Sequence, residues 1–310
     1  MSVVNPRPLR QQAPRPALRL ACRWASTMVC GAAVTVGFSA SAFAQSLAPM
    51  PAMEEVPFIT TPDNVTVAML ELAGVGPKDF VIDLGSGDGR IVITAARRFG
   101  ARGLGVEIVP ELVERSQRNA QRAGVADRAE FREQDLFKTD LNAASVITMY
   151  LLPAVNLQLR PALLGLKPGT RLVSHDWDMG EWTPDRTITV EAPTKAVGRE
   201  KLSQLHLWVV PAQAAGLWCG PAGLQWRLAQ QFQMLQGQAG PAADLQALQG
   251  RVDGTSLHLW APGGQARVQW RPGQGAGLAQ ATLLVLQASG TWQAWQGLSL
   301  QRVNGDRCNP

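Results

Sequence analysis

The sequence has few of the residues that build metal sites, and it carries little charge. Its 310 residues include three histidines and four cysteines, with no C-x-x-C pair and no cluster of cysteine and histidine. We therefore expect no bound metal ion. Charged residues make up 17% and apolar residues 46%, a balance that excludes a disordered chain and allows a sizeable core. At typical domain sizes this length predicts about two domains.

Acidic residues and lysine are absent from residues 1–44, which contain five arginines. The rest of the chain has 24 basic and 24 acidic residues, so the net charge of +5 belongs to the N-terminus alone. A neutral remainder lacks the basic surface that phosphate binding requires. We expect no nucleic-acid partner.

The N-terminus itself is typical of an export signal. Arginines end at Arg23, an apolar run extends from Trp24 to Phe38, and Ala42-Phe43-Ala44 matches the small-residue pattern before a cleavage site. The run is short for a membrane span of roughly 20 residues. We expect residues 1–44 to be a signal peptide, residues 45–57 a linker, and the protein to be periplasmic or secreted. A membrane anchor and an organellar transit peptide are the alternatives.

Two cysteines, Cys219 and Cys308, remain after removal of such a signal. An oxidising compartment would allow them to pair, closing a loop of roughly 90 residues. The alternative is that they are two small residues that never approach each other.

Residues 58–211 alternate short apolar runs with helical patterns, which predicts an α/β fold with a doubly wound, mostly parallel seven-stranded sheet. Strands are expected over Phe80–Leu84, Gly103–Glu107, Ala129–Glu133, Ser145–Tyr150, Arg171–His175, Thr187–Glu191 and Leu205–Val210. Helices are expected from Pro62 (capped by Thr61), over Arg90–Phe99, from Pro110 to Gly124 and over Pro153–Leu166. No helical pattern separates the last two strands, so we expect them to form an antiparallel hairpin.

Composition changes near residue 211. The final 100 residues hold 17 glutamines, most of the ten tryptophans and only nine charged residues. Short apolar runs between Gly- and Pro-containing turns predict a smaller, antiparallel β-rich accessory domain over residues 215–310, with one helix over Trp218–Gln236. Its tryptophans could line a sugar- or peptide-binding surface, but we favour packing in the core.

A glycine-rich loop is the sharpest functional signal. Asp83-Leu84-Gly85-Ser86-Gly87-Asp88-Gly89-Arg90 directly follows an expected strand and precedes an expected helix. The glycines let the chain turn tightly and let a ligand approach the bare backbone. Glu107, which ends the next strand, matches the acid that holds ribose hydroxyls in nucleotide-binding folds. This combination predicts an adenosine-type cofactor.

The charge of the loop indicates which cofactor. Asp83 and Asp88 would repel a pyrophosphate at the helix N-terminus but suit a ligand with an ammonium and a sulfonium. The glycine spacing also departs from G-x-G-x-x-G, and no Walker lysine follows. We therefore predict S-adenosylmethionine rather than NAD or ATP. Asp135, at the end of the third strand, is expected either to accept from the adenine amino group or to cap the following turn.

These motifs resemble the class I, seven-stranded S-adenosylmethionine-dependent methyltransferases over residues 56–211. The resemblance implies that Asp83, Gly85, Ser86, Gly87 and Asp88 cradle the methionine part, and that Glu107 and Asp135 bind the ribose and the adenine. Thr61-Pro62 together with the glycine loop further resembles the small non-SET protein-lysine methyltransferases, including those that modify an ATP-synthase c subunit. An Asn/Asp-Pro-Pro-Tyr motif is lacking after the fourth strand, which disfavours methylation of bases or glutamine.

The acceptor side offers weaker signals. Ligands bind beyond the carboxyl ends of the strands in such sheets. There the sequence offers Tyr150, His175, Asp176 and Asp178, of which Tyr150 and Asp176 are the candidate catalytic residues. The alternatives are that Tyr150 is an ordinary aromatic residue at a strand end and that Asp176 and Asp178 cap turns around Trp177. We expect His175 to face the core. The sequence thus predicts a methyltransferase acting on a protein amine (lysine) or a small molecule. The alternative is a non-catalytic exported binding protein that uses the same fold to present its C-terminal domain.

Overall fold

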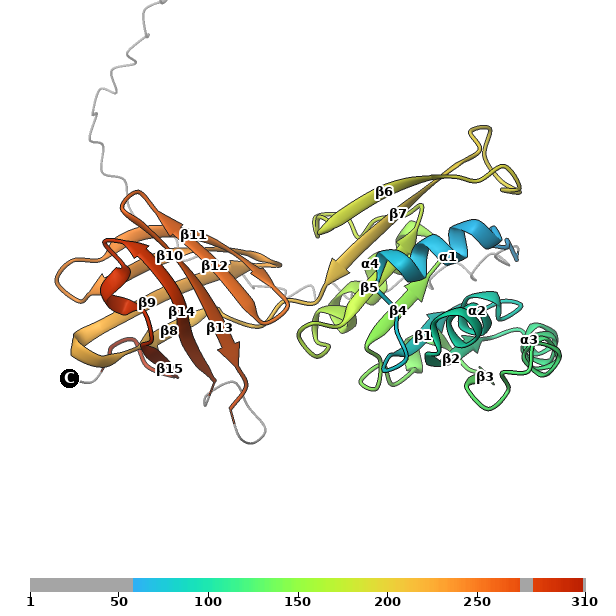
Figure 1. The fold of residues 1–310 in the computed structure, drawn as a ribbon, viewed down its shortest axis with the longest axis horizontal. Coiled ribbons are helices and arrows are strands. Elements are labelled where there is room, and N and C mark those ends of the chain that lie inside the picture. Colours follow the sequence, from blue (N-terminus) through green and yellow to red (C-terminus); the bar gives the residue numbers. More distant parts are fainter. Residues whose placement is uncertain (1–57, 274–280, 309–310) are drawn as a thin grey trace, which may run out of the picture. The chain divides into compact units, whose positions relative to one another are not determined.

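The computed structural model describes residues 58–273 and 281–308 of the chain. The predicted signal peptide (1–44) and linker (45–57) lie outside these residues. Within them the chain forms an α/β unit and then a β-barrel (Figure 1). Among the described residues, no helix combines the length and the apolar character needed to cross a membrane.

The α/β unit is built on a seven-stranded sheet in the order β3-β2-β1-β4-β5-β7-β6. Strands β1 to β5 run parallel, whereas β7 is antiparallel to both β5 and β6, as expected for a terminal hairpin. The predicted fold class is confirmed. The strands are β1 (Phe80–Leu84), β2 (Arg102–Glu107), β3 (Ala129–Glu133), β4 (Val146–Met149), β5 (Arg171–His175), β6 (Arg186–Glu191) and β7 (Leu202–Val209).

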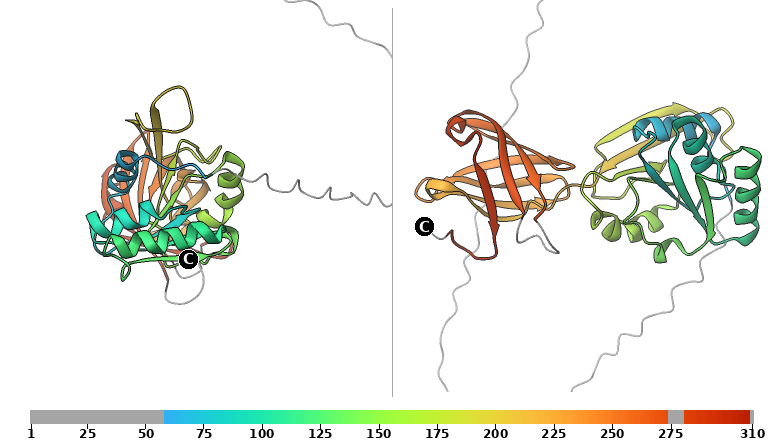
Figure 2. Two further views of the ribbon diagram at one scale, coloured as in Figure 1. Left: turned by 90° about the vertical axis from the view of Figure 1, so that its right-hand side faces the viewer. Right: turned by 60° about the horizontal axis from the view of Figure 1, so that its bottom comes forward.

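Helices cover both faces of this sheet, as the right-hand view of Figure 2 shows. One face packs against α1 and α2, with Val81, Val146 and Val173 in the contact layer. The other packs against α4, with Ile82 and Ile147, because successive strand side chains point to opposite faces. The helices are α1 (Asp63–Leu72), α2 (Arg90–Phe99), α3 (Pro110–Arg122) and α4 (Pro153–Leu164), with a 3₁₀ turn, η1, over Leu136–Lys138.

The start of α1 differs from the prediction. The helix begins after Pro62, and no side chain caps its first amides. Thr61, the expected cap, instead directs its hydroxyl to His175 Nδ1, 3.2 Å away at the end of β5. The Thr61 hydroxyl therefore bonds to a residue far along the chain and does not cap α1.

The C-terminal region forms a closed, antiparallel eight-stranded barrel in the order β10-β11-β12-β13-β14-β15-β8-β9. The expected helix over Trp218–Gln236 is wrong, because burial there alternates with a period of two: Leu224, Trp226 and Leu228 face inward. The strands are β8 (Gly216–Cys219), β9 (Leu224–Gln231), β10 (Met234–Pro241), β11 (Gln246–Asp253), β12 (Ser256–Ala261), β13 (Gly264–Arg271), β14 (Thr282–Gly290) and β15 (Ser299–Val303), with 3₁₀ turns η2 (Pro221–Gly223) and η4 (Gln293–Trp295).

Tryptophans fill the interior of the barrel. Trp218, Trp226, Trp270 and Trp292 are buried in its core, whereas Trp260 is exposed. The indole N–H of Trp218 donates to the carbonyl of Ala214 at 2.8 Å, so its polar end is satisfied inside the core. Core packing, rather than a tryptophan-lined binding surface, is thus the main use of these residues.

A disulfide joins Cys219 in β8 to Cys308 after β15, with 5.6 Å between the Cα atoms. The pairing expected from the sequence is present in the structure. It closes a loop with a sequence separation of 89 residues.

Replacing Cys219 and Cys308 together by serine is expected to lower the free energy of unfolding by about 3–5 kcal/mol, because the long loop is no longer closed in the unfolded chain. Denaturant unfolding followed by tryptophan fluorescence measures this change. Reductant should destabilise the wild type equally and leave the double variant unaffected. Equal stability of the oxidised wild type and the variant would contradict the prediction.

Candidate active site

The glycine loop lies at the carboxyl end of β1, a central strand between β2 and β4. Its amides are tied to the end of β2. The N–H groups of Gly85 and Ser86 both donate to the carbonyl of Val106 at 2.9 Å, and that of Gly87 donates to Glu107 Oε2 at 3.0 Å. Three glycines adopt positive φ, namely Gly85 (72°), Gly87 (54°) and Gly89 (81°). These hydrogen bonds and backbone angles define the shape of the loop.

Gly87 shows why a side chain is excluded from this loop. Its φ of 54° is one that L-residues rarely adopt, and a Cβ atom there would collide with the ring of Phe58. Phe58, a residue that is 42% exposed, thus places its ring directly against the backbone of the loop. A cradle for a ligand at Gly87 stays a prediction.

Asp83 ends up almost completely buried beneath the loop, with 2% of its surface exposed. Its Oδ1 accepts a hydrogen bond from the Thr148 hydroxyl on β4 at 2.7 Å. Burial raises the pKa of the Asp83 carboxyl to about 7, and the nearby charges of Glu107 and Asp88 act in the same direction, while the Thr148 hydrogen bond opposes them. A positively charged ligand would favour the ionised form. This electrostatic environment suits a cation and opposes an anion.

Glu107 is held at the end of β2 by three backbone amides. Oε1 accepts from Ile108 at 2.8 Å and from Val109 at 3.1 Å, and Oε2 accepts from Gly87 at 3.0 Å. The side chain therefore joins the two loops that follow β1 and β2. A role in binding the ribose stays a prediction, but the carboxylate is already fixed in place for it.

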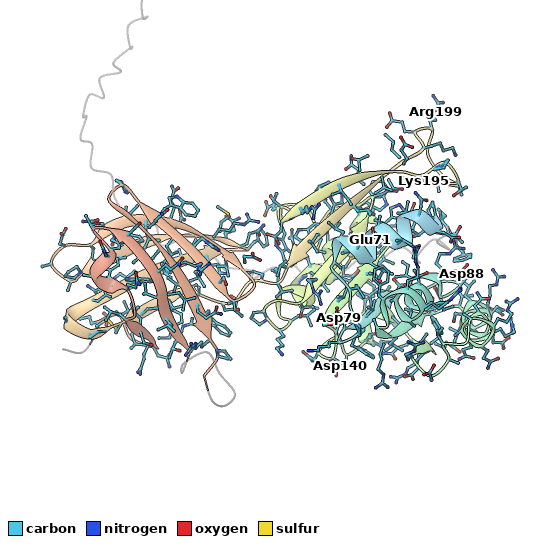
Figure 3. The ribbon with its side chains drawn as sticks, in the orientation of Figure 1. Glu71, Asp79, Asp88, Asp140, Lys195 and Arg199 are labelled. Atoms are coloured by element: carbon cyan, nitrogen blue, oxygen red, sulfur yellow. A yellow bond between two sulfur atoms is a disulfide. The ribbon has the colours of Figure 1, made fainter. Side chains whose placement is uncertain are left out.

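The carboxylate of Asp88 is paired with Arg90, whereas the sequence led us to expect a free negative charge facing the ligand. Arg90 binds both of its oxygens, Nε to Oδ1 at 2.9 Å and Nη2 to Oδ2 at 2.6 Å (Asp88 is labelled in Figure 3). The backbone N–H of Arg90 also points to Oδ1 at 3.3 Å, at the start of α2. The carboxylate thus occupies the position where a helix N-terminus would receive a phosphate. A pyrophosphate is therefore disfavoured here because the Asp88 side chain already fills the place that a phosphate would take.

Two other predicted cofactor residues have local roles. Asp135 Oδ1 accepts from the amide of Phe137 at 2.9 Å, which caps η1, and Lys138 Nζ lies 3.6 Å from Oδ2. The turn-capping alternative therefore describes Asp135 here, and contact with adenine stays a prediction. The Ser86 hydroxyl is buried without a hydrogen-bond partner among the described residues, and it faces β2 near Gly105.

A second cluster gathers at the ends of β4 and β5. Asp176, directly after β5, has a φ of 64°, which is uncommon for a non-glycine residue. Its backbone N–H donates to the carbonyl of Gln204 on β7 at 2.7 Å, and its Oδ1 accepts from the Gln204 amide at 3.1 Å. The remaining oxygen, Oδ2, accepts from the hydroxyl of Tyr150 at 3.4 Å. The structure thus brings together the two candidate catalytic residues.

His175 lies under this cluster as a buried core residue. Its Nδ1 is 3.2 Å from the Thr61 hydroxyl and its Nε2 is 2.8 Å from the Ser203 hydroxyl. Its ring stacks on Tyr150 with 3.9 Å between ring centroids. Burial lowers the pKa of His175 to about 4, so the imidazole is neutral. Burial and the neighbouring Asp176 charge raise the pKa of Tyr150 to about 12, so the phenol keeps its proton and acts as a donor.

Lys195 is the residue that sequence reasoning missed. It lies in the loop between β6 and β7, and its Nζ is 2.6 Å from Asp176 Oδ2. A lysine in a loop gives no local signal of such a contact, because only the hairpin geometry brings it to the end of β5. Asp178, by contrast, caps its own turn as expected, with Oδ1 accepting from Gly180 at 3.0 Å.

The two clusters adjoin. Leu151 directly follows Tyr150, and its side chain would contact a Cβ atom on Gly85 at 3.0 Å. The aspartate and tyrosine therefore lie next to the loop that would hold the cofactor. Among the described residues, no group of three or more histidine, cysteine, aspartate or glutamate side chains could hold a metal ion.

The known proteins that this chain resembles are methyltransferases. A family model described as the ANTKMT methyltransferase domain matches residues 83–186, from the end of β1 to the start of β6. A protein-lysine N-methyltransferase of Saccharolobus islandicus is 45% identical over 138 residues, which cover 44% of this chain and 86% of that protein. An adenine nucleotide translocase lysine N-methyltransferase of Mus musculus is 34% identical over 137 residues, which cover 44% of this chain and 59% of that protein.

The chain thus spans most of the first relative and less than two thirds of the second. Among solved structures, an RNA methyltransferase from Salinibacter ruber in complex with S-adenosyl-L-homocysteine is 51% identical. The match covers 50% of this chain and 95% of that chain, with a TM-score of 0.46.

Binding of S-adenosylmethionine at about pH 6.5 is expected to release a proton from Asp83, because a cationic ligand lowers the pKa of a carboxyl that is still largely protonated there. Release should vanish well above pH 7, where Asp83 is already ionised, and affinity should rise as the pH increases toward that range. Calorimetry in two buffers of different ionisation enthalpy counts the protons. Equal release from an Asp83→Asn variant would contradict the assignment.

A second variant for the same calorimetry is Glu107→Ala. Loss of charge-assisted hydrogen bonds should weaken cofactor affinity by roughly 10- to 150-fold. Proton release should persist but move to lower pH, because the Glu107 charge helps to raise the pKa of Asp83. NAD should bind none of these proteins. Unchanged affinity in a folded Glu107→Ala protein would exclude a ribose-binding role.

Proposed function

We propose that this chain, which belongs to the class I S-adenosylmethionine-dependent methyltransferases, methylates the ε-amine of lysine in a protein. Its relatives include proteins named as protein-lysine N-methyltransferases and as lysine N-methyltransferases of the adenine nucleotide translocase. One observation in the structure carries the choice of acceptor. The Asp176 carboxylate, next to the cofactor loop, holds a lysine ammonium, that of Lys195, at 2.6 Å. A site that binds this ammonium has the chemistry to bind the ammonium of an acceptor lysine.

The cofactor is S-adenosylmethionine, and the residues of the loop fit it. The carboxyls of Asp83 and Glu107 are the acidic groups that a cationic ligand requires, and Gly87, with a φ of 54°, adds no side chain to the loop. When bound, the cofactor supplies a methyl group on a positively charged sulfur. The protein then has to align the acceptor and exclude water. Phe58 and Leu151, which lie against Gly87 and Gly85, are placed for the second task.

Asp176 and Tyr150 are placed for the first task. A lysine ammonium must lose a proton before its nitrogen lone pair can attack the methyl carbon, whose bond to sulfur breaks as the new bond to nitrogen forms. Asp176 Oδ2 binds the ammonium and passes the proton to solvent, since its side chain is 18% exposed. The Tyr150 hydroxyl donates to the same oxygen at 3.4 Å and fixes its direction.

Asp176→Asn is expected to lower methyl transfer to protein lysines by about 100-fold or more, because the site loses the charge that binds the ammonium and takes its proton. Tyr150→Phe should cost about 3- to 10-fold, the loss of one hydrogen bond. Methyl transfer from labelled S-adenosylmethionine to an envelope protein extract, with methyllysine identified in digests by mass spectrometry, measures both.

The control is Asp178→Asn, two residues along, which removes an equal charge from a turn cap outside the cluster. It should transfer methyl groups like the wild type. Full activity of a folded Asp176→Asn protein would rule out this acceptor site. Methylated product without methyllysine would rule out the lysine acceptor.

We also propose that the protein is exported and that residues 1–44 are removed as a signal peptide. The Ala42-Phe43-Ala44 pattern supports this. So does the Cys219–Cys308 disulfide, because such bonds persist in oxidising compartments. N-terminal sequencing of protein from the periplasmic fraction should begin at or near Gln45. Full-length protein in the cytosolic fraction would contradict export.

A further inference from the structure

We infer that Lys195 occupies the subsite of the acceptor ammonium and competes with the acceptor lysine for Asp176. The inference rests on the proposed function, since it concerns the same site. Neither the family resemblance nor the site residues predicted from sequence include Lys195. Its consequence is that the acceptor binds only when this side chain has left the carboxylate.

The two oxygens of Asp176 have different partners. Oδ1 accepts from the backbone amide of Gln204 at 3.1 Å, whereas the Tyr150 hydroxyl and Lys195 Nζ both point to Oδ2, at 3.4 Å and 2.6 Å. His175 Nε2 also lies 3.6 Å from Oδ2. The nearby His175 is neutral and brings no second charge, because burial lowers its pKa to about 4. Two ammonium groups at a single carboxylate oxygen would repel each other at close range. The acceptor and Lys195 therefore exclude each other.

The contact is built into the hairpin and is not a chance surface pair. The side chains of Lys195 and Asp176 are only 10% and 18% exposed. Lys195 Nζ also donates to the carbonyl of Leu202 at 2.7 Å. The loop is closed on both sides of the residue, with the Lys195 amide donating to Ala192 at 2.9 Å and Lys201 Nζ donating to the Lys195 carbonyl at 2.6 Å. These bonds hold the ammonium over the site.

Arg199 provides a matched comparison in the same loop. Figure 3 labels both residues on the connection between β6 and β7. Arg199 carries the same charge, but its side chain is exposed, and only Lys195 reaches Asp176. A competing side chain lowers the apparent affinity of a ligand in proportion to the fraction of protein molecules whose site is free. Removing Lys195 should therefore tighten acceptor binding, and removing Arg199 should not.

Tyr150 allows direct measurement of binding, because it is the only tyrosine in the chain and its hydroxyl lies 3.4 Å from Asp176 Oδ2. Full-length protein labelled with ¹³C at the tyrosine ring carbon that bears the hydroxyl gives one such signal. We would titrate it, without cofactor, with Nα-acetyl-lysine methylamide and with the norleucine analogue, which lacks the ammonium. Lys195→Met should bind the lysine probe about 3- to 10-fold more tightly than the wild type. Arg199→Met should match the wild type, and the norleucine probe should bind none of them.

Equal or weaker binding of the lysine probe by Lys195→Met would overturn the inference. Failure of the proposed function looks different. In that case the titration can still show the tighter binding by Lys195→Met, while the transfer assay yields no methyllysine on protein acceptors.

Discussion

Hydrogen bonds from the glycine loop to the end of β2 are the constraint on which the site depends. They fix three successive amides, those of Gly85, Ser86 and Gly87, against Val106 and Glu107. Because β1 and β2 are adjacent parallel strands in a fixed register, the loop inherits its position from the sheet. The buried carboxyl of Asp83 and the packing of Phe58 both follow from that position. The shape of the glycine loop is therefore set by the carboxyl ends of two neighbouring strands in the sheet, β1 and β2.

The strands, helices and glycine loop of the α/β unit could be predicted from sequence because neighbouring residues specify each of them. Apolar runs, helix-opening prolines and the spacing of the glycines all lie within a few residues of the features they specify. The same reasoning failed where a distant residue competes for a group. Thr61 bonds to His175 instead of capping α1. Lys195 reaches Asp176 only through the β6–β7 hairpin, and no window of sequence contains both.

The barrel shows the other limit of sequence patterns. Between Leu224 and Phe232 the apolar residues fit either a helical or an alternating period. The alternating one prevails, because Leu224, Trp226 and Leu228 all enter the barrel core. Phe232 falls in the turn after β9, with a φ of 53°, and so belongs to neither pattern. Tertiary burial, which a short window does not record, decides between the two periods.

The strand that closes the barrel, β15, makes the shortest strand pairings in it. Strand β15 pairs three residues with β14 and three with β8, whereas the hairpin of β9 and β10 pairs eight. The disulfide lies at this seam, since Cys219 belongs to β8 and Cys308 follows β15. A reduced chain would open there first and expose unpaired strand edges, which are templates for association between molecules. Oxidation thus guards the barrel against aggregation as well as against unfolding.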